Sequence, residues 1–353
     1  MSLAELSIRN VRCIEEARLE LPRGLTLIWG GNGSGKTSVL ESIFMLGRGR
    51  SFRTRNNSRL ISRHKTFSRV IGKIETQAGL PVSLGIEVVA ERTRARISGR
   101  DVESLAELSQ SFAVQVIDPG IHRLIEEAGH RRRRWLDWSV FHVEPQFMEN
   151  WTRYTRALKQ RNAALRTSDP HALVWDEELA RLGELIAGSR QGLIEQLAPY
   201  WRETVAALSG LDIDLHYHRG WSQDYTLAEA LAASRARDAS RQVTHAGPHR
   251  ADVAVRVRGR PAKEVLSRGQ QKLVAAALTV AQLKLLKDAT AITPTLLLDD
   301  PAAELDAEHL ARFVDEVSRL RCQLVVTSLH AESRLFGAPD RTFRMEEGTA
   351  HPL

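Results

Sequence analysis

The sequence predicts an α/β fold that is interrupted by a long, mostly helical segment. Near the N-terminus, the apolar run Leu25–Trp29 leads into a glycine-rich loop and then into a helical pattern that starts at Lys36. Near the C-terminus, the apolar run Pro294–Leu298 ends in two consecutive aspartates. Residues 122–208 differ from both ends, because their apolar side chains recur at helical spacing.

Strands and helices alternate on both sides of this helical segment. Residues 68–98 alternate apolar and polar side chains between turn residues and are typical of a β meander. The other expected strands are Leu3–Ile8, Cys13–Leu21, Leu25–Trp29, Phe112–Ile117, Leu211–Tyr217, Val253–Val257, Pro294–Leu298 and Gln323–Val326. The other expected helices are Lys36–Leu46, Thr226–Arg237, Ser267–Leu286 and Ala307–Leu320.

The pattern indicates two domains, one of them discontinuous. The α/β texture returns after Gly247 and Pro248, so we assign residues 1–121 and 241–353 to one domain and residues 122–240 to a helical arm. An aromatic stripe in the arm recurs at spacings of four, three and four and lies on one helix face, where core packing explains it better than a cofactor site. Its members are Phe147, Trp151, Tyr154 and Leu158.

Composition limits the classes of protein to consider. No apolar stretch reaches the roughly 20 residues that cross a bilayer, and the N-terminus lacks a signal-peptide centre. We therefore expect a soluble, cytoplasmic protein without a membrane partner. Cys13 and Cys322 lie far apart, which predicts neither a disulfide framework nor a zinc site. The net charge of +7 favours a polyanionic partner, although arginine-rich coding alone gives the same excess.

The loop after Trp29 fits the pattern GxxxxGK[ST] of a phosphate-binding loop. Glycines allow successive backbone N–H groups to converge on an anion, and the following helix adds the partial positive charge of its N-terminus. We expect Lys36 to reach the terminal phosphates of ATP and the Thr37 hydroxyl to bind Mg²⁺. The expected nucleotide-binding residues here are Gly30, Gly31, Asn32, Gly33, Ser34, Gly35, Lys36, Thr37 and Ser38.

Carboxylates follow the strand near the C-terminus. A P-loop fold places its second metal-binding group at the end of such a strand, so Asp299 is expected to hold Mg²⁺ and Asp300 to polarise the attacking water. Asp306 lies in the turn before the next helix and is a further candidate for contact with the nucleotide. Gln115, in the strand Phe112–Ile117, is a candidate for sensing metal and water.

A second helix start has the features of an anion site. Ser267 is well placed as an N-cap, and Gly269 and Gln270 follow it. An ordinary helix cap explains the serine alone, but the order of the motifs along the chain favours a role in binding ATP. The phosphate-binding loop, then this motif, then Asp299 and Asp300 is the order of an ABC-type ATPase, in which such a signature motif contacts ATP held by the other protomer.

These residues, taken together, resemble the RecF family of SMC-like ABC ATPases over nearly the whole chain. The family resemblance implies a P-loop ABC/SMC-like ATPase head with an inserted helical arm. The segments that carry it are 8–12, 30–41, 49–54, 132–137, 159–165, 247–252, 266–271 and 299–306. The segments outside the ATP site are the specific ones, because any ABC ATPase has the others.

The resemblance also implies a function. It predicts an ATP-dependent homodimer on double-stranded DNA near junctions with single strands, with RecR and RecO as partners in the loading of RecA. Each ATP would be held by Lys36 and Thr37 of one chain and by Ser267 and Gly269 of the other. Hydrolysis would be weak, stimulated by DNA, and would act as a switch. Arg50, Arg53 and Arg55 are the candidates for DNA phosphates, while Arg131–Arg134 either contact DNA or pair within the arm.

Two positions depart from the usual ABC pattern or leave it open. Most ABC ATPases have Glu where this chain has Asp300, and the shorter side chain predicts slow turnover. The switch-histidine position is open between His330 and Ser328. One alternative is another SMC-like ATPase that acts as a nucleotide-gated scaffold. A less favoured alternative is an ABC transporter subunit, because transporter ATPases lack a large helical arm between the phosphate-binding loop and the signature motif.

Overall fold

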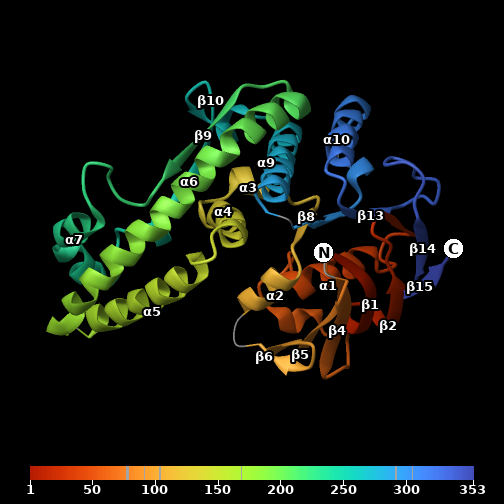
Figure 1. The fold of residues 1–353 in the computed structure, drawn as a ribbon, viewed down its shortest axis with the longest axis horizontal. Helices are drawn as coiled ribbons and strands as arrows, with labels where there is room; N and C mark the ends of the chain where they lie inside the picture. The colour runs from red at the N-terminus through yellow and green to blue at the C-terminus, as the bar shows by residue number, and fades with distance from the viewer. Residues whose placement is uncertain (77–78, 91, 103–104, 168, 291, 304) are drawn as a thin grey trace. The chain divides into compact units, whose positions relative to one another are not determined.

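The computed structural model describes residues 1–76, 79–90, 92–102, 105–167, 169–290, 292–303 and 305–353. The chain packs into two compact units (Figure 1). Unit 1 comprises Met1–Ile121 and Ala291–Leu353, and unit 2 comprises His122–Thr290. The two ends of the chain therefore build one unit, and the middle builds the other.

The strands described in unit 1 form two six-stranded sheets. The first sheet is antiparallel, in the order β2 (Ile14–Glu20), β1 (Ser2–Val11), β4 (Phe67–Glu75), β5 (Pro81–Val89), β6 (Arg92–Ile97) and β7 (Arg100–Asp101). The second runs β15 (Thr349–Pro352), β14 (Arg341–Glu346), β3 (Leu25–Trp29), β13 (Gln323–Ser328), β12 (Thr295–Leu298) and β8 (Val114–Ile117), and all of it except β15 is parallel.

Helix α1 (Lys36–Arg48) belongs to the same core as both sheets. Its apolar residues share a buried cluster with Leu6 of the first sheet and with Leu297 and Val325 of the second. The helix is buried on nearly all sides, and its buried polar side chains Lys36, Glu41 and Ser42 each have a hydrogen-bond partner. The other helical segments of unit 1 are η1 (Asn57–Leu60), α2 (Leu105–Ser111), η4 (Pro301–Ala303) and α10 (Ala307–Arg319).

One buried side chain joins the two sheets of unit 1. The amide nitrogen of Gln323, on β13, donates to the carbonyl oxygens of Leu3 (2.7 Å) and Pro22 (2.8 Å). Its amide oxygen accepts from the Leu3 N–H (2.8 Å) and the Thr295 hydroxyl (2.8 Å). All four hydrogen-bonding positions of the amide are satisfied, so Gln323 fixes β1 against the end of the parallel sheet.

Unit 2 is mostly helical. Its longest element is α6, and α5 and α9 both pack along it. Its helices are α3 (Arg123–Glu126), α4 (His130–Val143), α5 (Phe147–Arg166), η2 (Pro170–Trp175), α6 (Asp176–Ser209), α7 (Leu227–Arg241), η3 (Pro248–Arg250), α8 (Ala262–Val265) and α9 (Arg268–Ala289). A small antiparallel sheet is formed by β9 (Ile213–His218), β10 (Asp252–Val257) and β11 (Arg260–Pro261).

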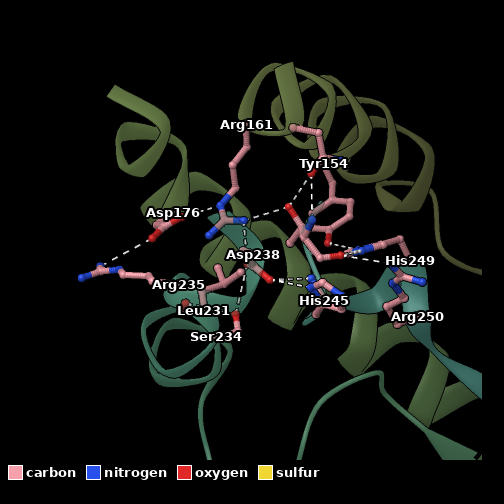
Figure 2. Close-up of polar contacts among 12 residues, drawn as sticks. Tyr154, Arg161, Asp176, Leu231, Ser234, Arg235, Asp238, His245, His249 and Arg250 are labelled. Atoms are coloured by element: carbon pink, nitrogen blue, oxygen red, sulfur yellow. Dashed lines mark hydrogen bonds and ion pairs between the residues drawn. The ribbon is translucent and has the colours of Figure 1, made fainter. Parts of the chain in front are cut away.

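A buried arginine organises the centre of unit 2 (Figure 2). The Arg161 guanidinium on α5 is fully buried and donates to Asp176 (2.7 Å) and Asp238 (2.8 Å), which come from α6 and α7. It also donates to the Thr244 hydroxyl (2.9 Å), in the loop before η3. Asp238 in turn contacts the ring of His245 (2.8 Å). A buried charge is tolerated when it is paired in this way, so the cluster fixes three helices and one loop together.

The arginine run Arg131–Arg134 lies at the start of α4, and its members include residues with contacts inside unit 2. Arg132 makes a two-pronged pair with Asp252 at 2.9 Å, and Arg131 pairs with Glu127 at 2.6 Å. Arg133 donates to the carbonyl oxygen of Ala251 at 2.5 Å. Of the two interpretations of this run, the structure supports pairing within unit 2.

Some predicted elements have different bounds in the structure, and the structure also contains elements that were not predicted. Strand β1 extends to Val11, and α2, α8, β11 and the β14–β15 hairpin were not predicted. The aromatic stripe does lie on one helix, α5, with Phe147 and Tyr154 buried and Trp151 stacked between them. Within the part of the chain that the structure describes, no helix has both the length and the apolar character to cross a membrane.

The packing boundary between the units differs from the expected domain boundary. The first boundary, between residues 121 and 122, is the same in both. The second lies after Thr290 rather than after residue 240, because α9 packs on α6 and Gln282 of α9 donates to the Trp135 carbonyl (2.7 Å) of α4. The segment 241–290 therefore belongs by contact to the helical unit.

Replacing Gln323 by Met should destabilise unit 1 selectively. The variant keeps the side-chain volume but leaves the Leu3 backbone groups without their buried partners, at a cost on the order of 3 kcal/mol. Urea unfolding followed by hydrogen exchange of peptides from β1 and β13 measures the loss. Gln191→Met, at an exposed site on α6, is the control. Equal unfolding midpoints for the two variants would contradict the role of Gln323.

Candidate nucleotide-binding site

The glycine-rich loop joins β3 to α1. Gly35 has φ of 111°, and a Cβ there would lie 3.2 Å from Met345 and 3.3 Å from Cys13, so glycine is required by both conformation and space. Gly30 also has no room, since its Cβ would lie 2.3 Å from the Met345 carbonyl oxygen. At Gly31 and Gly33, by contrast, a Cβ would meet nothing within 4 Å. The loop therefore leaves a cradle in front of α1 that side chains would fill.

The start of α1 fits an anion. The helix has no side-chain cap at Gly35 and no acidic residue in its first turn. Its first N–H groups and its dipole therefore favour negative charge. The Ser34 hydroxyl is buried without a hydrogen-bond partner among the described residues, which adds a polar group to the same loop.

Lys36 is the first residue of α1 and is mostly buried. Its ammonium donates to the carbonyl oxygens of Gly30 (2.7 Å) and Gly31 (2.8 Å), so the side chain folds back over the loop. Burial lowers the pKa of Lys36, and the nearby carboxylates of Asp300 and Asp299 counteract this. The ammonium thus lies between the loop and the two aspartates.

Thr37 and Asp299 come together although they are far apart in sequence. The Thr37 hydroxyl lies 3.0 Å and 3.1 Å from the two carboxylate oxygens of Asp299. The parallel pairing of β12 with β13, and of β13 with β3, brings the ends of these strands to one edge of the sheet. Sequence reasoning placed both residues at the metal site, and the structure brings them together.

The donor set of this pair fits Mg²⁺. A hydroxyl and a carboxylate are hard oxygen ligands, and Mg²⁺ is usually held by one or two carboxylates together with substrate phosphates. Within the described residues, no group of three or more His, Cys, Asp or Glu could hold a metal ion. Thr37 and Asp299 would therefore hold Mg²⁺ together with phosphate oxygens rather than within a cage of protein ligands.

Asp300 has an unusual backbone conformation. Its φ is 48°, in the left-handed region that Asp and Asn tolerate better than most residues. Burial raises the pKa of Asp300, and Asp299 adds to this, whereas the charges of Lys36 and His330 oppose it. Ser328 is buried and accepts from the His330 N–H (3.1 Å), and the switch position stays open between these two residues.

Thr327 was missed by sequence reasoning. Its hydroxyl lies 2.8 Å from an Asp299 carboxylate oxygen and accepts from the Asp300 N–H at 3.0 Å. A threonine in a buried strand has an ordinary explanation in β propensity, so no sequence signal distinguished it.

Gln115 does not join this group. It pairs in register with Leu296, so it faces the same side of the sheet as Leu296 and Leu298. Asp299 alternates to the other side, with Leu297. The polar residue at the carboxyl end of β8 is instead Asp118, which follows Ile117. The carbonyl of Ile117 accepts from the Asp299 N–H at 3.0 Å. The expected metal-sensing role of Gln115 thus has no support in this geometry.

The signature motif lies at the start of α9 in unit 2. Ser267 is its N-cap and forms a capping box with Gln270, with bonds of 3.3 Å and 3.0 Å. Gly269 is exposed, and a Cβ there would meet nothing within 4 Å. Glycine inside a helix costs about 0.5–1 kcal/mol relative to alanine. Neither the backbone nor the packing of unit 2 requires Gly269.

The remaining nucleotide candidates have local structural roles. Asp306 is the N-cap of α10, where it accepts from the His309 N–H at 3.0 Å. Its contact with His309 lowers its pKa. Asn32 is exposed in the loop, and Ser38 is buried on α1. The structure places Asn32 and Ser38 with the cradle and leaves the role of Asp306 beyond capping as an expectation.

The loop with the candidate DNA arginines is tied to α1 through a buried carboxylate. Glu41 is fully buried and forms a two-pronged pair with Arg12 at 3.1 Å. It also accepts from the Ser51 hydroxyl, which in turn accepts from the Arg53 N–H at 2.9 Å. Arg53 and Arg55 are exposed, and Arg50 is half-buried. The arginines thus lie on an ordered loop.

The chain is similar to known proteins over nearly its whole length. Residues 2–349 match the family described as RecF/RecN/SMC N terminal domain. The DNA replication and repair protein RecF of Pseudomonas aeruginosa is 39% identical over 358 aligned positions, covering 99% of this chain and 97% of that protein. The protein of the same name from Thioalkalivibrio sulfidiphilus is 38% identical over 357 positions, covering 99% of each.

Solved structures share the fold. A structure described as the recombination mediator protein RecF with ATP, in the RecFOR pathway, has a TM-score of 0.89 and 24% identity, covering 99% of this chain and 97% of that one. An Smc head bound to the C-terminal winged-helix domain of ScpA has a TM-score of 0.59 and 16% identity, covering 100% and 97%.

Replacing Asp300 by Asn should stabilise unit 1 more at neutral than at acidic pH. The raised pKa means that Asp300 supports folding while protonated, and this contribution is lost as pH rises through its folded-state pKa. Asn does not titrate and tolerates the left-handed backbone. The free energy of urea unfolding should be measured for the variant and for the natural chain at about pH 4 and pH 7. The gain of the variant over the natural chain should be larger at the higher pH. A difference independent of pH, or equal to that of the exposed Asp214→Asn, would contradict this.

Proposed function

The chain belongs to the RecF family of SMC-like ATPases, and we propose that it is an ATP-dependent DNA-binding protein of recombinational repair and replication. The observation that carries the proposal is the site in unit 1, where Lys36, Thr37 and Asp299 meet at the glycine cradle. The alternatives, a scaffold of another SMC-like kind and a transporter subunit, are not favoured, because relatives named RecF match 99% of the chain.

The residues of unit 1 would divide the work on ATP. The cradle N–H groups and Lys36 bind the phosphates, and Thr37 and Asp299 hold Mg²⁺, which neutralises charge on the phosphate oxygens. Asp300 would orient the attacking water. Its side chain is one methylene shorter than that of Glu, which gives it a poorer reach to the water, so we propose slow turnover.

The exposed start of the signature helix, at Ser267 and Gly269, supports an ATP-dependent homodimer. Gly269 weakens α9 without serving its own unit, which is expected where another surface must approach the backbone closely. We propose that Ser267 and Gly269 of one chain complete the site formed by Lys36 and Thr37 of the other. Because ATP then lies in the interface, hydrolysis opens the dimer.

Double-stranded DNA near single-strand junctions is the proposed nucleic-acid partner, and Arg50, Arg53 and Arg55 are the proposed contacts with phosphates. Contacts of this kind give binding that is independent of sequence and sensitive to salt. RecR and RecO are proposed as protein partners, in keeping with the RecFOR pathway named for a related structure, and RecA is proposed because the family resemblance implies it.

Lys36→Ala should abolish ATP binding and ATP-induced dimerisation, since it removes the ammonium that bonds the Gly30 and Gly31 carbonyls beside the cradle. Sedimentation with ATP, Mg²⁺ and a short duplex measures both association and DNA binding. Asp300→Asn is the matched control, because it should still dimerise and hold the duplex. A Lys36→Ala chain that dimerises on DNA with ATP would contradict the switch.

Gly269→Met should weaken ATP-dependent dimerisation at least about tenfold, which corresponds to about 1.4 kcal/mol, while leaving ATP binding by the single chain intact. The side chain would occupy the surface that we assign to the second protomer. Gly188→Met is the matched control, because Gly188 is also helical, exposed and open at its Cβ. If both variants dimerised alike in sedimentation, the signature helix would not be part of the interface.

A further inference from the structure

Thr327 occupies a position between the two aspartates of the site. We propose that Thr327 is a positioning residue that fixes the Asp299 carboxylate for the metal and the Asp300 backbone for the attacking water, an inference that rests on the proposed ATPase function. It lies on β13 next to β12, where Val326 is in register with Leu298. Its side chain is fully buried.

The donors and acceptors around the Thr327 hydroxyl leave one consistent arrangement. A hydroxyl has one proton to donate and two lone pairs to accept with. It accepts from the Asp300 N–H at 3.0 Å, and its proton points to the Asp299 carboxylate at 2.8 Å, because the Leu298 carbonyl at 3.5 Å is a poorer acceptor. A single group thus bonds both consecutive aspartates.

Asp299 is thereby held between two hydroxyls. One of its carboxylate oxygens accepts from Thr327, and both lie within hydrogen-bond distance of Thr37. A partner that binds a ligating carboxylate fixes its orientation and tunes its affinity for the metal. With Thr327 in place, the carboxylate is oriented before any metal binds.

Asp300 depends on the same hydroxyl through its backbone. Its left-handed conformation, with φ of 48°, is less favourable than the right-handed one and persists where neighbours enforce it. The bond from its N–H to Thr327 is one such constraint. The direction in which the Asp300 side chain leaves β12 is therefore set in part by Thr327.

The test is Thr327→Val, which keeps the β-branched shape and removes only the hydroxyl. The matched control is Thr26→Val on the neighbouring strand β3. Thr26 is equally buried, is in register with Val325, and has a hydroxyl without a hydrogen-bond partner in the described structure. Thr327→Ser, which retains the hydroxyl, is the rescue variant. Should Thr327→Val fail to fold, Thr327→Cys replaces it, since a thiol is a weak donor.

Three quantities separate positioning from a general loss of structure. They are the affinity for a fluorescent ATP analogue without metal, the affinity of that complex for Mn²⁺ measured by electron paramagnetic resonance, and the turnover number with Mg²⁺. Thr327→Val should lose about 10- to 100-fold in Mn²⁺ affinity and in turnover, with metal-free nucleotide affinity unchanged. Thr26→Val and Thr327→Ser should stay close to the natural chain.

Two results would overturn the inference in different ways. If Thr327→Val bound Mn²⁺ and turned over ATP as Thr26→Val does, Thr327 would not position the aspartates, and the proposed function would stand. If the natural chain bound neither the ATP analogue nor Mn²⁺, the proposed function would fail and the role of Thr327 with it.

Discussion

The site depends on the parallel register of β3, β13 and β12. β3 and β12 lie on either side of β13, so the end of β3 before the glycine loop and the end of β12 before Asp299 reach the same edge of the sheet, where Thr37 and Asp299 meet. A shift of one residue in either pair would turn Asp299 to the opposite side of the sheet. Gln323 stabilises this register at the start of β13, because all four hydrogen-bonding positions of its side-chain amide are satisfied. The loop can bind phosphate only in a sheet that is aligned in this way.

The sequence predicted the elements that carry strong local patterns and missed the contacts that depend on three dimensions. The glycine loop, α1 and Asp299 were predictable, because glycine spacing and strand-end carboxylates have direct physical meanings. Gln115 was placed by its strand alone, and only the register shows that it faces away from Asp299. Thr327 was not predictable, because its role arises from hydrogen bonds to a neighbouring strand. The charge of the arginine run was visible in the sequence, but its acidic partners, such as Asp252, lie far along the chain.

Buried arginines connect the elements of the helical unit. Arg161 and Arg190 are both fully buried, and each pairs with at least one carboxylate and bonds the segment 244–252. The carbonyl of Pro248 accepts from Arg190, and the carbonyl of Ala251 accepts from Arg133. This loop leads through β10 and α8 into the signature helix α9. Arginines whose charge in the sequence suggests a nucleic-acid surface therefore stabilise the segment that precedes Ser267.

The discontinuous layout of unit 1 has a consequence for synthesis on the ribosome. Strand β3, which carries the glycine loop, pairs with β13 on one side and with β14 on the other, and both come from the last part of the chain. Domains form as units while the chain emerges N-terminal end first. Unit 2 is contiguous and can fold as soon as residue 290 has left the exit tunnel, while β3 waits without neighbours. A nascent chain therefore cannot engage nucleotide until β13 and β14 have been translated, which protects a half-made protein from premature assembly.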